Sequence, residues 1–436
     1  MLMHPGRMPN PIPFAWNHAF LHTVFFVLLI LVTDLASAQE KRPLTLQEAE
    51  ELALFDEPGQ NSYLSRAEAL RDESIAGGQL PDPMMRVGLA NYPIQSGGFT
   101  TEGMTQAQLG LRQVFPRGDT RELTTEKFRT LANEMSHKAD KRGRDVLTAV
   151  RIAWLETHYW REAHQMAIES RPFFDDLVTI TRSLYSVGRK SQQDVLRAEL
   201  ELSRLDDRII DMSKQHSRSR AALSEWVGTE AGRPVAASLP EWKAVPPLEV
   251  LKTDLRAHPA MLAADASVGA SFVGVDLAEQ EYKSDWAVDI GYGYRNGELS
   301  SGEPRSDFIS MSVTFGLPFF RGNRQDKSVG AALSQRRAAD QSREELLRHL
   351  ASQLESEFVR WQDLGRRLDL YEKLILSVSA DNANAALTAY QSDTGDFADA
   401  MRGFVDDLDT RLEYIRLQVE RSQSYAVLAN LGGISR

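Results

Sequence analysis

The sequence contains no cysteine among its 436 residues. Disulfide frameworks, thiolate metal sites, cysteine nucleophiles and lipid attachment to a cysteine are therefore excluded. Glycine-rich phosphate loops and Ser-His-Asp arrangements are also missing, and beyond residue 38 no two histidines lie four positions apart. We therefore expect no enzymatic activity, no cofactor and no resident metal.

Positive charge is in deficit, and long apolar runs are missing. Lysine and arginine total 50 against 61 aspartates and glutamates, which gives a formal net charge of −11. This balance argues against a nucleic-acid partner, because such surfaces need clustered basic residues. A run of 18 or more apolar residues does not occur, which excludes a bundle of membrane-spanning helices. The short, half-polar strands of a membrane β-barrel remain compatible with the composition.

The first 38 residues have the pattern of an export signal. An apolar stretch at 24–32 follows Arg7, and the small residues Ala-Ser-Ala at 36–38 match a signal-peptidase site. We expect cleavage there and a mature chain that begins near Gln39, outside the cytoplasm. The alternative is an uncleaved anchor, for which the apolar stretch is short.

The chain contains an internal repeat. Three features recur in the same order at an offset of about 205 residues: Phe115-Pro116-Arg117-Gly118 as Phe319-Phe320-Arg321-Gly322, Tyr185 with Asp194 as Tyr390 with Asp399, and Leu223 with Gly228 as Leu428 with Gly433. We infer a duplication with a first unit over 39–240 and a second over 241–436, joined where prolines interrupt the helical pattern.

Each unit is expected to hold two short strands and two long helices. The strands should cover about 84–92, 104–115, 286–295 and 308–317, and the long helices 119–185, 191–226, 323–390 and 397–430. From Leu347 to Tyr371 the apolar residues recur with a mean spacing near 3.5, which is typical of a coiled-coil seam. A helix over 119–185 would be a rod of about 100 Å, and Pro172 should kink or locally unwind it.

The expected strands have one apolar and one small or polar face. In the second pair the apolar face holds Val288, Ile290, Tyr292, Met311, Val313 and Phe315, whereas Asp289 and Ser312 lie on the other face. The strand lengths are those of tilted strands that cross a bilayer, so we expect this apolar face to meet lipid. Four strands cannot close a barrel, and an open edge cannot lie in lipid, so several chains would have to share one barrel. The alternative is a four-stranded sheet in a soluble domain.

This layout resembles the TolC-type outer-membrane efflux channels. The resemblance rests on the duplicated unit, on the hairpins that end in Phe-Pro-Arg-Gly or Phe-Phe-Arg-Gly, and on the Tyr-Ser-Val-Gly turn at 185–188. It implies a mainly α fold with a small β part: a homotrimer with an α-helical barrel and a shared twelve-stranded barrel in the outer membrane of a Gram-negative envelope. It also implies a passive duct that serves a periplasmic adaptor and an inner-membrane pump of the RND type. The segments 82–83, 89–93 and 104–106 resemble the members that are paired with heavy-metal pumps, so metal cations are the substrate that this resemblance suggests.

The resemblance also assigns candidate site residues. The two helix turns would form a periplasmic tip with a gate, and the residues assigned to it are Tyr185, Gly188, Asp194, Tyr390, Asp393, Asp396, Asp399 and Arg402. The strand-to-helix junctions would be formed by Phe115, Pro116, Gly118, Pro318 and Gly322. For the acids of the second turn, a solvated helix start is an equally good interpretation.

Two other classes of protein compete with this interpretation. A periplasmic coiled-coil adaptor or scaffold of an envelope complex would share the long helices, but it would lack two hairpins at matching places in a duplicated chain. An envelope enzyme would need a set of convergent polar residues, and the sequence shows none.

Overall fold

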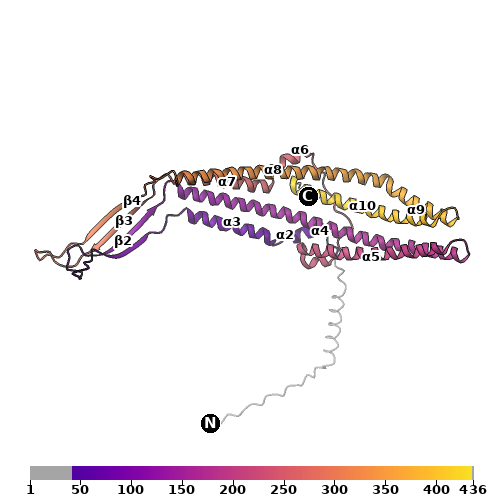
Figure 1. The fold of residues 1–436 in the computed structure, drawn as a ribbon, viewed down its shortest axis with the longest axis horizontal. Coiled ribbons are helices and arrows are strands. Elements are labelled where there is room, and N and C mark those ends of the chain that lie inside the picture. Colours follow the sequence, from indigo (N-terminus) through magenta and orange to yellow (C-terminus); the bar gives the residue numbers. More distant parts are fainter. Residues whose placement is uncertain (1–41, 435–436) are drawn as a thin grey trace, which may run out of the picture.

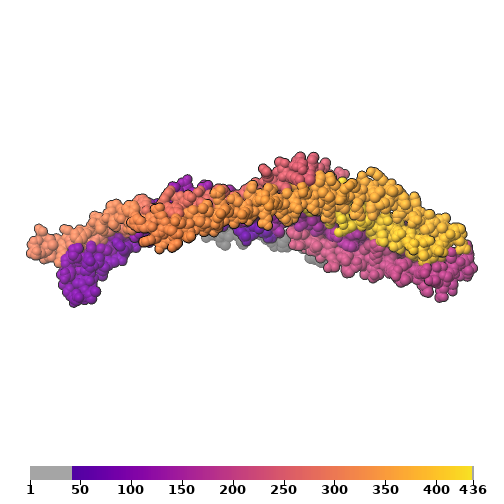
Figure 2. Space-filling model, turned by 45° about the horizontal axis from the view of Figure 1, so that its top comes forward, coloured from indigo at the N-terminus to yellow at the C-terminus, as the bar shows by residue number. Residues whose placement is uncertain are grey.

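The structure is a computed structural model, and it describes residues 42–434. The molecule is long and narrow, with the strands at one end and paired helices along the rest of its length (Figures 1 and 2). The expected signal peptide over 1–38 lies outside the described residues.

The first half of the chain builds two short helices, a β-hairpin and a long helical hairpin. Its elements are α2 (Leu46–Leu54), α3 (Pro58–Gly77), β1 (Met84–Ala90), β2 (Gln106–Phe115), α4 (Thr120–Ser186), α5 (Gln192–Val227) and the 3-10 turn η1 (Gly228–Gly232). With 67 residues, α4 is about 100 Å long and reaches from the strands to the opposite end of the molecule (Figure 1).

The second half repeats this arrangement. Its elements are α6 (Leu248–Asp254), the 3-10 turn η2 (Leu255–Ala257), α7 (Pro259–Gln280), β3 (Trp286–Tyr294), β4 (Phe308–Phe315), α8 (Gln325–Leu370), the π turn η3 (Tyr371–Ile375), α9 (Leu376–Gln391) and α10 (Phe397–Gly432). The fold is therefore mainly α with one small sheet, as the sequence predicts, and each half has helix, hairpin and long helices in the same order.

The two long helical runs differ from expectation at one point each. Pro172 lies inside α4, and the helix continues through it, so of the predicted kink or local unwinding the unwinding does not occur. The corresponding run in the second half contains the π turn η3, which no proline explains. The predicted seam is confirmed, because Leu350, Leu354, Leu364 and Leu368 are all buried.

Separate apolar cores hold the helices together. Near the turns, one core takes side chains from α4, α5, α9 and α10, among them Phe174, Leu177, Tyr390 and Met401. Near mid-length, a second core packs α2 and residue Leu44 against α4. These cores make the two helical hairpins one packed body at the end far from the strands.

Within residues 42–434, one helix is apolar enough by length and composition to cross a membrane, namely α7. In the structure it packs lengthwise against α4 and α8. Its buried residues include Met261, Ala270 and Val273. Because it has packing partners along its length, we interpret α7 as a helix of the rod.

The four strands form one antiparallel sheet in the order β1-β2-β3-β4. The central pairing joins the two halves of the chain and places Leu111 opposite Ile290 and Arg112 opposite Asp289. The outer strands β1 and β4 each leave one edge unpaired within the described chain. The sheet thus has two open edges at the tip of a slender molecule (Figure 1).

Candidate functional site

One face of the sheet is apolar except at Gln113, the cross-strand partner of Val288. The register aligns Met85, Leu111, Ile290 and Met311 across all four strands, since successive pairings bring them side by side. Leu109, Tyr292 and Ile309 form a second row beside them, and the two rows line a shallow apolar hollow of about 340 Å³. The side chains are strongly exposed, up to 81% for Ile309. Such a face is stable only against another apolar phase.

Aromatic side chains flank this apolar face at both ends. Toward the helices, Phe115 stacks on Trp286 with ring centroids 4.1 Å apart, and Phe315 pairs with Trp286 on the next strand. Toward the loops lie Tyr292 and Tyr294, both nearly half exposed. An aliphatic band between two aromatic girdles is typical of strands that cross an outer membrane.

The opposite face of the sheet is mostly polar or small, with Met84, Val114 and Phe308 as its large apolar residues. Arg112 lies 3.9 Å from Asp289, and Ser312 is the cross-strand partner of Asp289. Gly291 and Gly293 leave room on this face, because a Cβ at either position would meet the side chain of Ser310 or Gln106. No helix of the described chain covers either face, so the alternation is not that of a sheet packed in a soluble core.

The first junction between strand and helix is held by contacts with the second half of the chain. Gly118 has φ +47°, and a Cβ there would collide with Lys283 and Gln280 at the end of α7. Asp119 lies 3.0 Å from the ammonium of Lys283. Pro116 lies in this junction, between the end of β2 and Gly118. In the second half Pro318 and Gly322 flank Phe319 and Phe320, which are about four-fifths exposed.

The two helix turns lie side by side at the other end of the molecule (Figure 1). In the second turn Asp393 has φ +65°, which is the conformation of Gly188 in the first turn at φ +71°. Lys190 of the first turn donates to Asp393 at 2.7 Å, and Arg189 lies 3.7 Å from the same carboxylate. These ion pairs connect the turns within one chain.

The electrostatics of this contact favour both charged forms. The hydrogen bond from Lys190 holds the pKa of the Asp393 carboxyl below its usual range, and the same bond raises the pKa of Lys190. The Lys190 ammonium also lies 4.8 Å from the ring centroid of Tyr390. Tyr390 is fully buried, packs edge-on to Phe397, and lies with its hydroxyl 3.4 Å from that of Thr181. Tyr390 is therefore a packing residue of the tip.

The remaining acids of the turns have the geometry of helix starts. Asp194 and Ser191 form a capping box, in which each side chain accepts a hydrogen bond from the other residue's backbone. Asp396 is the N-cap residue of α10, although its side chain makes no capping bond. Asp399 lies 3.5 Å from Arg402 one turn later on α10. Both side chains are about two-thirds exposed, so this ion pair adds little stability.

Comparison with solved structures decides the fold. The outer-membrane channel OprN superposes with a TM-score of 0.74 at 17% identity, covering 89% of this chain and 90% of that one. CusC, whose structures describe conformational changes that accompany folding and transmembrane channel formation, superposes with a TM-score of 0.76 at 13% identity, covering 90% of this chain and 92% of that one. The outer-membrane protein VceC from Vibrio cholerae superposes with a TM-score of 0.73 at 15% identity, covering 89% of this chain and 96% of that one.

This chain has the outer-membrane channel fold. The resemblance to TolC-type channels is thus confirmed at the level of the fold, across nearly the whole described chain. By sequence alone, no known family profile and no curated protein match it.

On this channel fold the predicted residues fall into three separate groups. The strand residues lie at one end, the junction residues follow them, and the turn residues lie at the far end of the rods (Figure 1). Tyr185 is about half exposed, unlike its repeat equivalent Tyr390. Sequence reasoning missed Arg189 and Lys190. The signal for them was present, because an acid in the second turn replaces the glycine that precedes two bases in the first.

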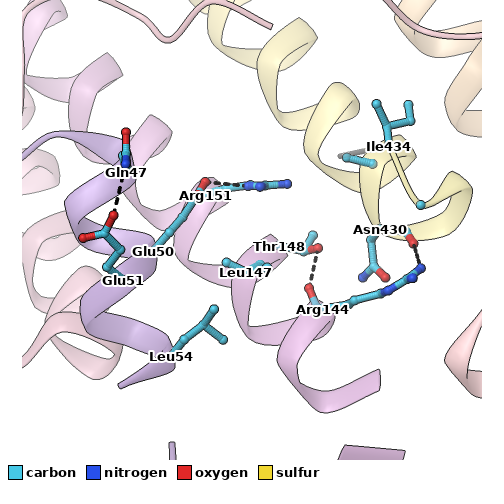
Figure 3. Close-up of a pocket in the computed structure, with 12 residues that line it drawn as sticks. Gln47, Glu50, Glu51, Leu54, Arg144, Leu147, Thr148, Arg151, Asn430 and Ile434 are labelled. Carbon is cyan, nitrogen blue, oxygen red and sulfur yellow. Dashed lines mark hydrogen bonds and ion pairs between the residues drawn. The ribbon is translucent and has the colours of Figure 1, made fainter. Parts of the chain in front are cut away.

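A cavity of about 690 Å³, lined by both charged and apolar side chains, lies at mid-length between α2, α4 and the end of α10 (Figure 3). On its wall Arg151 donates to Glu50 at 2.7 Å, and both side chains are only 10% exposed. Arg144 donates to the carbonyl of Asn430 at 3.2 Å. Burial lowers the pKa of Arg144. Among the described residues no cluster of three or more histidines and acids has the arrangement of a metal site.

Proposed function

We propose that this chain is the outer-membrane channel of a tripartite efflux system. Three copies would each contribute the four strands of the sheet to one closed barrel of twelve. The long helices of the same copies would continue as a tunnel into the periplasm. The protein would act as a passive duct and not as an enzyme, because passage through a pore requires no bond to be made.

The observation that carries this proposal is the uncovered apolar face between two aromatic girdles. With 10 residues, β2 spans about 33 Å when extended, or roughly 23 Å at a 45° tilt. This height matches the apolar band of outer-membrane barrels, which is about 25 Å tall. The open edges of β1 and β4 would pair with the edges of neighbouring copies, since lipid offers no hydrogen-bond partner.

Two features support the orientation. The polar face with Arg112, Asp289 and Ser312 would line the water-filled lumen, and Ile290 and Val313 would meet lipid. The helix turns would form the periplasmic tip, where Asp399 lies just after the second turn and is exposed. Three such carboxylates around one axis would favour cations.

The partners and the substrate follow from the same proposal. A periplasmic adaptor and an inner-membrane pump of the RND type would supply substrate at the tip. We propose metal cations as the first substrate class to test, since the strand-end segments resemble the heavy-metal branch and the chain carries a net charge of −11.

Envelope fractionation tests the proposal directly. The protein should sediment with the outer membrane and migrate faster on a gel before heating than after it, as closed barrels do. An adaptor or scaffold would fractionate with the periplasm or inner membrane and would show no heat-dependent migration. That result would exclude the channel.

A further inference from the structure

The four helices near the turns form a row with two free ends. Within the described chain α5 packs mainly on α4, α4 on α10, and α10 on α9. The helices α5 and α9 therefore each have one long side without a neighbour among the described residues. On these sides Leu196 and Leu200 of α5, and Val378 of α9, are half exposed or more. Apolar side chains that recur along one side of a helix are typical of a packing surface.

The internal repeat indicates what covers the free side of α5. Ser191 caps α5 and Asp396 is the N-cap residue of α10, so the two helices correspond at an offset of 205 residues. Leu196 is 57% exposed, whereas its equivalent in α10, Met401, is only 5% exposed. Met401 belongs to the core that α10 shares with α4. The free side of α5 therefore corresponds to the side of α10 that α4 covers.

A second copy of the chain offers an equivalent of α4. At the same offset α4 corresponds to the run from α8 through η3 to α9. Phe173 and Phe174 of α4 contact Phe404 of α10 through their rings. The equivalent of Phe173 is Val378, which lies about 140° around α9 from Ala383, the residue that approaches α10. The free side of α9 in one copy therefore matches the free side of α5 in the next.

The sheet has the same arrangement at the other end of the molecule (Figure 1). Its open edges belong to β1 in the first half of the chain and to β4 in the second half. The free helix sides likewise belong to α5 in the first half and to α9 in the second. Both contacts would therefore join the first half of one copy to the second half of the next.

The contact between copies is less apolar than the contact within a chain. Within a chain, the ring centroids of Phe174 and Phe404 lie 6.4 Å apart. The repeat equivalents that would meet between copies are Ser379 and Glu199. Glu199 is already paired with Arg182 of its own chain at 2.6 Å. Because the burial of apolar area chiefly stabilises such contacts, the contact between copies should separate before the contact within a chain.

The helix turns show the same difference. Within a chain, Lys190 of the first turn donates to Asp393 of the second. At the repeat offset Asp393 corresponds to Gly188 of the first turn, and Lys190 corresponds to Gly395 of the second. The second turn of one copy therefore has no base at this place, and the first turn of the next copy has no acid there. This ion pair is thus confined to the two turns of one chain.

We propose that the copies meet near the tip through α5 and α9, and that the tip opens by separation of these three contacts. The two helical hairpins of each chain move as one body and keep the ion pair between Lys190 and Asp393. The proposal rests on the trimeric channel proposed above and adds which contact gives way when the channel opens.

Cross-linking tests the contact, because the chain contains no cysteine and two introduced thiols are the only ones present. Leu200→Cys with Val378→Cys, treated with a short reducible bismaleimide, should give covalent dimers and trimers on a denaturing gel. The matched control is Val405→Cys with Phe173→Cys, since these repeat equivalents lie at the contact between α4 and α10. It should give cross-linked monomers only. Leu200→Cys with Val359→Cys should give no products between copies, since Val359 is as exposed as Val378 but lies about 28 Å further along the helix.

Single-channel recording in a planar bilayer tests the opening. Cross-linking of Leu200→Cys to Val378→Cys should lower the open fraction at least severalfold, and cleavage by reductant should restore it. The control pair at positions 173 and 405 should open as often before cleavage as after it. If that pair fails to assemble, Arg208→Cys with Asp409→Cys replaces it, because these residues form an ion pair between α5 and α10 of one chain.

The outcomes separate this proposal from the channel itself. A trimer by mass that forms no cross-link between positions 200 and 378 would overturn the contact. Equal opening of this pair before and after cleavage, or loss of opening in the cross-linked control, would overturn the separation of copies. A monomer by mass, in contrast, would contradict the proposed channel and with it any contact between copies.

Discussion

Replacing Ile290 by arginine puts a charge in the middle of the apolar face of the sheet. Ile290 lies between Leu111 and Met311 on the neighbouring strands and is half exposed. An arginine near the bilayer midplane of an outer-membrane barrel costs about 2–4 kcal/mol per side chain. Since each of three copies would carry the substitution, the free energy that stabilises the folded trimer should fall by about 6–12 kcal/mol.

Ser312→Arg is the matched control for this substitution. Ser312 lies at a similar height on the opposite face, where Asp289 is its cross-strand partner. An arginine there would face water and a carboxylate, so the expected loss is close to zero. The assay is folding into lipid vesicles, followed by the fraction of protein that shows heat-modifiable migration. Equal folding of both variants would refute the assignment of the two faces.

The remaining predictions concern the helix turns and the core at mid-length. Asp399→Ala should change single-channel conductance or cation block in a planar bilayer, and Arg402→Ala should raise the fraction of open channels. Unchanged conductance in both variants would show that Asp399 serves only as a residue of the helix start. Because the pKa of Asp393 is lowered in the folded chain, its ion pairs stabilise the tip above its unfolded pKa of about 3.9 and are lost as pH falls below that value. Amide protection factors at 186–192, which correct for the intrinsic slowing of exchange in acid, should fall modestly below about pH 4 in the parent, and Asp393→Asn should lower them to a similar extent at neutral pH. Glu50→Ala should cost about 3–5 kcal/mol in denaturant unfolding, because it leaves the buried Arg151 without its carboxylate; a loss below about 1 kcal/mol would show that water replaces it.

The arrangement along the chain could be predicted from sequence because it depends on local periodicity. The alternation in 286–295 and 308–317 reflects a sheet with two different faces, and the strands β3 and β4 begin at the predicted residues and end one or two residues earlier. The spacing from Leu347 to Tyr371 reflects a helix packed along one side. Both patterns arise between near neighbours in the chain, so they are visible without a structure.

The contacts between the halves could not be predicted in the same way. Lys190 and Asp393 lie about 200 residues apart, and although the repeat places the two turns at one tip, local periodicity does not indicate which acid of the second turn pairs with Lys190. The same holds for Trp242, which reaches Tyr425 only because the connection crosses the rods. The continuity of α4 through Pro172 is also a tertiary effect. Packing of the turns on either side, with Phe174 and Leu177 buried, outweighs the local preference of proline for a break.

The most direct test of the channel is the mass of the purified protein in detergent. Native mass spectrometry should give three copies of the chain, since only neighbouring copies can pair the open edges of β1 and β4. The trimer should persist on dilution, and proline placed in β4 at Val313 should reduce its yield by removing an edge hydrogen bond. A monodisperse monomer with a folded sheet would contradict the shared barrel and, with it, the proposed function.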